Sequence, residues 1–277
     1  MTCISNGGFS PPHMNLVDHH THNSLCRHAV GGVLDYARAA KASGLAGIGL
    51  SDHAPSPTIS DDWRMTPDQL PIYLEQAAKT KEFMGDFPVL LGLEVDFIES
   101  ERPWIETLSI MAPWDFLIGS VHYLAPGWDV DNPRWIGRFQ ELGVETVWEM
   151  YWEAFDTCAR SGLFDLLAHV DLVKKFGHRP EGDLRRFYEP ALEAIKAGGS
   201  AVEFSTAGLR KPVGECYPGP EMLAMLVEAG VPLAISSDAH DPLEVGADFA
   251  QAANTLRALG CQETVTFFRR EQRRLPL

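Results

Sequence analysis

Several features that define whole classes of proteins are missing from this sequence. No apolar run approaches the roughly 18 residues that a membrane-spanning helix requires, so we expect no membrane partner. The segment Met1 to Pro12 has neither a basic start nor an apolar stretch, which argues against a signal peptide. Internal repeats and low-complexity tracts are also missing. The sequence therefore predicts a globular protein rather than a solenoid or a membrane protein.

Cysteine and positive charge are both scarce. The five cysteines are irregularly spaced and include no Cys-x-x-Cys pair, so we expect neither a disulfide framework nor a thiolate zinc site, and a cytoplasmic location. Lys and Arg number 23 against 38 Asp and Glu, a net charge of -15. Such a surface repels nucleic-acid backbones, so we expect no nucleic-acid partner. A small anionic substrate remains compatible with this charge, because bound metal ions can invert the local field.

Short apolar runs alternate with longer amphipathic stretches along the 277 residues. The apolar runs are typical of strands covered on both faces. They span residues 14–17, 46–50, 89–95, 116–121, 165–168, 201–205, 232–236 and 264–268. The amphipathic stretches predict helices at residues 30–43, 66–84, 144–161, 184–197, 220–229 and 243–259. With seven or eight such units and no linker, we expect one α/β barrel, with long loops at residues 54–64 and 125–135.

Seven of the ten histidines fall at or beyond the carboxyl end of a predicted strand. They are His20, His22, His28, His53, His122, His169 and His240, and the carboxylates Glu94 and Asp238 fall at similar points. Parallel strands of a barrel end on one face, so these side chains should converge. Imidazoles and carboxylates are ligands of zinc, iron and manganese. A single histidine is more often an ordinary core or surface residue, but the whole set predicts a multinuclear metal site. His19 should point to the opposite side of its strand.

At these residues the sequence resembles the PHP (polymerase and histidinol phosphatase) family. The motifs that carry the resemblance are residues 18–22, 51–53, 119–122 and 237–240, together with Glu94 and His169. Residues 172–178 and 205–212 are similar to segments of its histidinol-phosphate phosphatase branch. His19 is a departure, because it stands where the family more often has a small residue. The resemblance covers nearly the whole chain, from about Asn15 to Phe268.

The resemblance implies a distorted (β/α)7 TIM-like barrel as a single domain, residues 1–277, with residues 1–13 as an N-terminal extension. It also implies three divalent transition metals, which the donor atoms allow to be Zn, Fe or Mn. The implied first set is His20, His22, Glu94 and Asp238; the second is Glu94, His122 and His169; the third is His28, His53 and His240.

The implied activity is hydrolysis of a small phosphate ester, L-histidinol phosphate, to L-histidinol and phosphate. We expect metal-bound hydroxide to attack phosphorus directly, because the sequence has no obvious motif for an activated Ser, Cys or Asp nucleophile. Asp52 is a candidate proton donor to the leaving alcohol or a residue that orients an imidazole. The candidates for binding substrate and its phosphate are Arg210, Lys175, Lys174, Arg64 and His178.

Three alternatives stay open at this point. Another PHP phosphoesterase, acting on nucleotides or a different phosphate ester, would have the same barrel and metals. An amidohydrolase-like enzyme also begins with His-x-His, but it typically uses a bridging Lys, whereas Glu94 and the terminal Asp238-Ala239-His240 fit PHP better. A non-catalytic PHP domain would have lost ligands, and every expected ligand is present.

Overall fold

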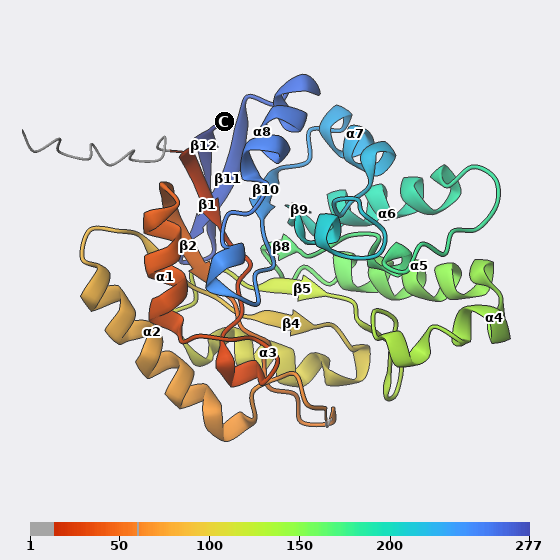
Figure 1. Ribbon diagram of the computed structural model, residues 1–277. Helices are drawn as coiled ribbons and strands as arrows, with labels where there is room; N and C mark the ends of the chain where they lie inside the picture. Colours follow the sequence, from red (N-terminus) through yellow and green to blue (C-terminus); the bar gives the residue numbers. More distant parts are fainter. Residues whose placement is uncertain (1–13, 60) are drawn as a thin grey trace, which may run out of the picture.

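Short parallel strands alternate with helices in the computed structural model, which describes residues 14–59 and 61–277 (Figure 1). The parallel strands are β1 (Met14–Asp18), β2 (Leu45–Leu50), β3 (Val89–Leu91), β4 (Glu94–Asp96), β5 (Ile118–Ser120), β8 (Leu166–Leu167), β9 (Ala201–Ser205) and β10 (Leu233–Ser236). The helices are α1 (Val33–Ala42), α2 (Leu70–Met84), α3 (Arg102–Met111), α4 (Arg138–Leu142), α5 (Val144–Arg160), α6 (Arg185–Gly198), α7 (Pro220–Glu228) and α8 (Phe249–Ala258). The proposed N-terminal extension, residues 1–13, lies outside the described residues.

The parallel strands form a ring of seven positions. One sheet has the order β1-β2-β3 and the other the order β10-β9-β8-β5-β4. Only Gly92 and Leu93 separate β3 from β4, so these two form one interrupted strand position. Single parallel bridges, His53 to Glu94 and Thr21 to Ala239, join the two sheets on either side. The ring is therefore the predicted distorted (β/α)7 barrel, and both joining bridges lie at the carboxyl ends of strands.

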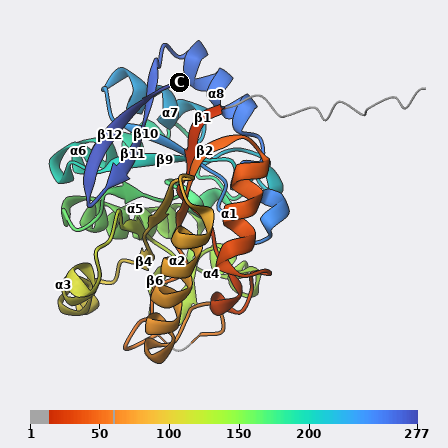
Figure 2. The ribbon, with the colours of Figure 1, turned by 90° about the vertical axis from the view of Figure 1, so that its left-hand side faces the viewer.

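The helices cover the outside of this ring. Figure 2 shows α1 and α2 side by side. Helix α1 packs on β2, α2 packs on β3, and α5 packs along α6. Their apolar faces meet the outer faces of the strands in one large core, which is why the strands read as continuous apolar runs. A Pro lies in the first turn of α3, of α7 and of the 3₁₀ helix η2 (Pro67–Gln69), where its missing N–H costs no helical hydrogen bond.

The interior of the ring is filled at the end opposite the predicted site. Phe116 packs there with Phe267, and a Cβ on Gly92 would come within 2.6 Å of the Phe116 ring. Glycine at this position therefore makes room for the aromatic ring. His19 points into the same interior, its Nε2 2.9 Å from the Thr266 hydroxyl and its ring edge-on to both phenylalanines. His19 thus faces away from the other strand-end histidines, as predicted.

Phe267 and Thr266 belong to a C-terminal hairpin, whereas the sequence pattern predicts another strand of the parallel sheet here. The apolar run 264–268 forms β11 (Glu263–Phe268), but β11 pairs antiparallel with β12 (Glu271–Pro276) and takes no position in the parallel ring. The hairpin lies beside β1 and β10 (Figure 1). Val265 and Phe267 alternate into the barrel interior, so the run is apolar because it closes the barrel, not because it is an eighth parallel strand.

Smaller differences concern loops and helix ends. A short hairpin of β6 (Tyr123–Ala125) and β7 (Trp128–Asp129) extends into the predicted loop 125–135, and α3 and α4 were not predicted. Helix α8 begins at Phe249, later than predicted, because positive φ angles at Gly246 and Asp248 interrupt the helical pattern. None of the helices in the described ranges combines the length and apolar character needed to cross a membrane.

Candidate metal centre

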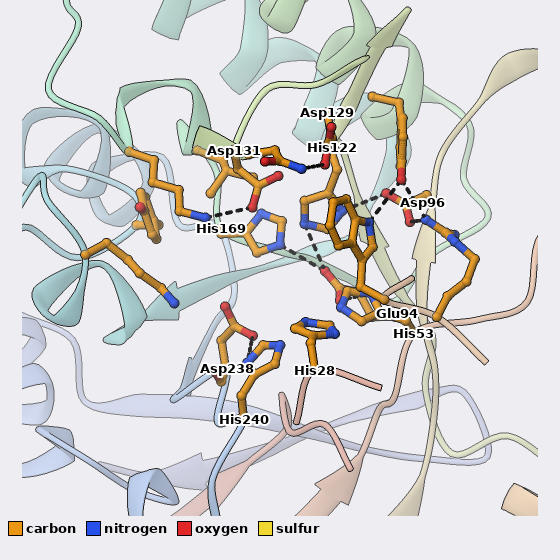
Figure 3. A pocket seen from close by; sticks show the side chains of 18 of the residues that line it. His28, His53, Glu94, Asp96, His122, Asp129, Asp131, His169, Asp238 and His240 are labelled. Carbon is orange, nitrogen blue, oxygen red and sulfur yellow. Dashed lines mark hydrogen bonds and ion pairs between the residues drawn. The ribbon is translucent and has the colours of Figure 1, made fainter. Parts of the chain in front are cut away.

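The predicted histidines meet around one cavity at the carboxyl ends of the strands. The cavity has a volume of about 510 Å³, and five of the seven line it (Figure 3): His28, His53, His122, His169 and His240. His20 and His22 adjoin this set and are wholly buried. The His22 ring centroid lies 4.3 Å from that of His53 and 4.2 Å from that of His240. The structure therefore brings the predicted set together, while its role in metal binding stays a prediction.

Glu94 lies at the centre of these imidazoles. Its Oε1 is 2.9 Å from His169 Nε2, and its Oε2 is 3.0 Å from His53 Nδ1 and 3.3 Å from His20 Nε2. The side chain is only 1% exposed, and it starts β4, immediately after the Gly92-Leu93 interruption. One carboxylate that faces imidazoles from several strands has the position expected of a bridging ligand.

Four overlapping groups of donor atoms are close enough together to hold an ion. Within each group the donor atoms lie within 4.8 Å of one another; the groups are His20, His22 and Glu94; Glu94, His122 and His169; His22, His53 and His240; and His22, Cys26 and Asp52. In the fourth group, Cys26 and Asp52 are not among the described residues that line the cavity. The first two match the predicted sets, and Asp238 Oδ1 lies 3.1 Å from His22 Nε2. The third differs, because His22 takes the place predicted for His28. The His28 ring is nevertheless adjacent, 4.5 Å from that of His240.

Unsatisfied buried atoms test whether these residues fit metal ions. Among the described side chains, His20 Nε2, His53 Nδ1 and Glu94 Oε2 are buried and form no well-aligned hydrogen bond, although both nitrogens lie close to the carboxylate oxygen. Leaving such atoms unpaired costs free energy that a coordinated cation would recover. The donors of the first three groups are nitrogen and carboxylate oxygen, the combination that zinc, iron and manganese accept. The residues present therefore fit divalent transition metals.

The charged groups of the site shift the pKa values of its side chains in different directions. Burial lowers the pKa of His122, but the neighbouring Asp96 carboxylate more than compensates and raises that pKa to about 10. Burial and the nearby His53 lower the pKa of His28 to about 4. Burial raises the pKa of Glu94, yet the surrounding imidazoles, His53 foremost, hold it well below its usual value. Glu94 is therefore ionised at neutral pH, the state that metal binding requires.

Two ligand candidates have unusual backbone geometry. His169 has a φ of 26° and Asp238 a φ of 51°, both on the left-handed side that L-residues rarely adopt. Such conformations cost about 1–2 kcal/mol and tend to occur at functional sites, where the surrounding fold enforces them. The turns after β8 and β10 are thus held in conformations that aim these side chains at the cavity.

Glu203 is part of the site, although the sequence analysis did not select it. It lies in the middle of β9, is completely buried, and its Oε2 is 2.9 Å from His20 Nδ1. A carboxylate between the apolar residues Val202 and Phe204 of this strand is the signal that could have identified it. Asp96 contacts His122 in the same way, with Oδ1 2.6 Å from Nδ1. Carboxylates behind metal-binding imidazoles orient the ring and raise its basicity.

Asp52 lies behind His22 rather than in the cavity. Its Oδ1 is 3.5 Å from His22 Nδ1, and the carboxylate is completely buried. Asp52 does not belong to the described residues that line the cavity. This position suits the predicted role of orienting an imidazole better than the predicted transfer of a proton to the leaving alcohol.

Three predicted substrate-binding residues lie outside the cavity lining. Arg210 Nη2 donates to the Ser237 carbonyl at 2.6 Å. Lys174 is fully buried, with Nζ 3.0 Å from Asp171 Oδ2. The His178 ring stacks on another aromatic ring, that of Phe139, at 4.5 Å. Each of these side chains is therefore engaged in holding loops together, and none contributes to the described cavity wall.

Three cationic side chains do line the cavity. Lys175 Nζ is 2.9 Å from Asp131 Oδ2, and Arg64 is paired with Asp96 at 2.9 Å. Lys211 was not selected from the sequence, but it also lines the cavity. Among the residues that the structure describes, Lys211 forms no ion pair. The loop after β9 therefore contributes a cation to the cavity, but this cation is Lys211 rather than its neighbour Arg210.

A ring of parallel strands with imidazoles and carboxylates at their carboxyl ends is typical of metal-dependent α/β-barrel enzymes.

Residues 18–207 of the chain match the model of the PHP domain family. The chain is 42% identical to the probable histidinol-phosphatase of Deinococcus radiodurans over 258 residues, which is 92% of this chain and 98% of the relative. It is also 30% identical to the histidinol-phosphatase of Bacillus subtilis, over 83% of this chain and 95% of the relative. The chain therefore belongs to the PHP domain family.

Solved structures resemble the fold over nearly its full length. The histidinol phosphate phosphatase of Lactococcus lactis subsp. lactis, complexed with zinc, L-histidinol and phosphate, superposes with a TM-score of 0.77 at 19% identity and covers 94% of this chain and 99% of its own. The putative histidinol phosphatase of Listeria monocytogenes gives a TM-score of 0.76 at 21% identity, covering 85% and 99%. At these identities the similarity establishes the barrel fold.

Proposed function

We propose that this chain is a metal-dependent phosphomonoesterase that hydrolyses L-histidinol phosphate to L-histidinol and phosphate. The observation that carries the proposal is the cluster of imidazoles around Glu94 in a cavity whose wall also bears lysines. The names of the relatives, histidinol-phosphatase in Bacillus subtilis and probable histidinol-phosphatase in Deinococcus radiodurans, supply the substrate. The Lactococcus lactis complex with zinc, L-histidinol and phosphate supports the same choice.

We further propose that the site holds three divalent ions, of zinc, iron or manganese. The proposed sets are His20, His22, Glu94 and Asp238; Glu94, His122 and His169; and His53 and His240 with His28 or His22. When bound, such ions lower the pKa of water towards neutrality and neutralise phosphoryl charge. Glu94 would belong to two of the three sets, which requires its carboxylate to stay ionised.

The phosphate of the substrate should contact the lysines of the cavity wall. Lys211 is the stronger candidate, because Lys175 is already paired with Asp131. Arg210, which was the candidate from the sequence, instead holds the Ser237 carbonyl in the turn that precedes Asp238. We therefore assign phosphate binding to Lys211 and assign Arg210 to the geometry of that turn.

The cationic end of histidinol phosphate should face the acidic and aromatic part of the wall. Asp131 lines the cavity, and although burial raises its pKa, Lys175 holds that pKa below its usual value. Trp63 and Tyr123 line the same cavity, and aromatic faces attract cations. No serine, threonine or cysteine occurs among the described residues of the lining, which supports attack by water without a covalent Ser, Thr or Cys phosphoenzyme.

A phosphate-release assay on purified protein tests the proposal. Histidinol phosphate and mononucleotides would be compared side by side, each with zinc, iron and manganese. Hydrolysis of histidinol phosphate at a higher kcat/KM than any nucleotide is expected. Activity on nucleotides with none on histidinol phosphate would favour the alternative, a PHP phosphoesterase with a different substrate.

A further inference from the structure

In several imidazoles of the metal centre, one ring nitrogen, Nδ1, points away from the centre. The group that contacts this nitrogen differs from one histidine to another. His20 Nδ1 contacts Glu203 Oε2 at 2.9 Å, and His122 Nδ1 contacts Asp96 Oδ1 at 2.6 Å. Both partners are carboxylates with less than a tenth of their surface exposed. We call His20 and His122 the inner imidazoles. Each of them has a negative charge directly behind it.

In two imidazoles nearer the cavity mouth, the nearest partner of this nitrogen is a backbone carbonyl instead. His28 Nδ1 lies 3.1 Å from the Cys26 carbonyl oxygen. His240 Nδ1 lies 3.1 Å from the Asp238 carbonyl oxygen and 3.6 Å from Asp238 Oδ1. We call His28 and His240 the outer imidazoles. The His240 side chain is 23% exposed and His28 is more exposed still, whereas His20 is 0% exposed. His20 and the outer imidazoles therefore differ in both partner and access to water, whereas the His122 side chain, at 13% exposed, is intermediate.

Glu203 is the most informative of the carboxylate partners. It is completely buried, its Oε1 has no hydrogen-bond partner among the described residues, and His20 is the one described group that its Oε2 contacts. Burying a carboxylate is costly unless a positive charge compensates it. Asp96 is shared, because Arg64 also pairs with it at 2.9 Å. A change at Glu203 therefore acts through His20, whereas a change at Asp96 also releases Arg64.

A carboxylate behind an imidazole makes the opposite nitrogen a stronger donor to a metal ion, and removing such a partner typically weakens binding by about 10- to 100-fold. A backbone carbonyl has a smaller effect, because it carries no net charge. We propose that Glu203 is a positioning residue that sets how firmly the ion at His20 is held, so that this ion is retained while the ion at the outer imidazoles exchanges. This inference rests on the proposed metal sets, but not on the identity of the substrate.

The test follows metal release from the zinc-loaded protein after a chromogenic chelator is added. The wild-type protein should release its zinc in two phases, a fast one from the outer imidazoles and a slow one from the inner imidazoles. In Glu203→Gln, which keeps the shape of the side chain but removes its charge, the part of the slow phase that comes from the ion at His20 should become about 10- to 100-fold faster. The fast phase should not change.

The control is Glu101→Gln. Glu101 is also a buried glutamate, but its Oε1 accepts from the Ser56 and Thr58 hydroxyls, away from the imidazoles. Both phases should be unchanged in this variant. A misfolded Glu203→Gln protein would be recognised because excess zinc could not restore full occupancy, whereas a weakened site refills. In that event Glu203→Asp, which keeps the charge but shortens the side chain, would replace it, with an intermediate slow rate expected.

Two outcomes would overturn the proposal: a single release phase in the wild-type protein, or a slow phase that is the same in Glu203→Gln and the wild type. Because no substrate is present, these results do not depend on the phosphatase assay. Two release phases together with inactivity on histidinol phosphate would reject the proposed substrate and leave the division of the metal centre standing.

Discussion

His19 and His20 are neighbours in the sequence, yet they face opposite ends of the barrel. His20 lies 2.9 Å from Glu203 and 3.3 Å from Glu94, in the metal centre. His19 contacts Phe116, Phe267 and the Thr266 hydroxyl at the closed end. Burial lowers the pKa of His19 to about 3, whereas for His20 the effect of burial is outweighed by the carboxylates, Glu203 foremost, and its pKa is raised.

The comparison separates two functions of the barrel interior. At the closed end, aromatic rings and the C-terminal hairpin exclude water and contribute stability. At the open end, carboxylates and imidazoles face one another with atoms left unpaired, an arrangement that contributes little stability without ions. If this separation holds, mutations at one end should affect metal binding and catalysis, and mutations at the other should affect the free energy of unfolding.

The largest effect is expected at the centre of the open end. Glu94→Gln should reduce kcat/KM for the phosphate ester by about 1,000-fold or more, because loss of metal coordination removes several kcal/mol of transition-state stabilisation. The metal content per chain, measured by atomic emission, should fall in parallel. A Glu94→Gln protein with full metal content and activity within tenfold of the wild type would contradict the bridging role.

At the closed end, Phe267→Ala should lower the free energy of unfolding by about 3–5 kcal/mol, because it leaves a cavity in the barrel interior. Denaturant titration measures this change, and metal content in the folded state should be unchanged. Phe268→Ala is the matched control, since Phe268 is 39% exposed and its loss should cost under about 0.5 kcal/mol. Equal effects of the two variants would show that the hairpin does not fill the barrel.

A smaller effect is expected on the wall of the open end. Lys211→Ala should raise KM by about 10- to 100-fold, the value of a charged hydrogen bond of about 1.5–3 kcal/mol, without loss of metal. Steady-state kinetics and metal analysis together measure this. Lys196→Ala, which removes an exposed lysine paired with Glu193 on α6, should leave KM unchanged. An unaltered KM in Lys211→Ala would remove Lys211 from the phosphate site.

The smallest effect is expected at His19. His19→Leu should change the free energy of unfolding by about 1 kcal/mol, because it removes the hydrogen bond to Thr266 but keeps an apolar side chain between two aromatic rings. Metal content and kcat should match those of the wild type. If His19→Leu lost metal, the two ends of the barrel would not be independent.

Much of the fold could be predicted from the sequence, because it depends on local periodicity. The run of β2 and the pattern of α5 are recognisable from apolar spacing alone, and the predicted ranges agree with the observed ones within a residue or two. The C-terminal run 264–268 could not be placed in the same way. An apolar strand has the same sequence pattern whether it belongs to a parallel ring or to a hairpin that closes the ring. Only the pairing of β11 with β12 distinguishes these two arrangements.

The site was predictable to the extent that chain topology dictates it. Parallel strands bring their carboxyl ends together, so His53, His122 and His169 had to approach one another once the ring was inferred. The cations were not predictable in this way. Arg210 and Lys211 are adjacent in one loop, and which of them faces the cavity depends on the conformation of that loop and on the Ser237 carbonyl that holds Arg210.

The sequence by itself determined that a barrel would form and that histidines would gather at one of its ends. The alternation of apolar runs with amphipathic stretches predicts the barrel, and the position of the histidines after these runs predicts where they gather. Only the tertiary structure decided how each imidazole is held. Glu203 is 183 residues from His20 in the sequence, and no local pattern links them. Their contact arises because the ring brings β9 and the end of β1 together around a shared interior, where a buried carboxylate needs a positive partner.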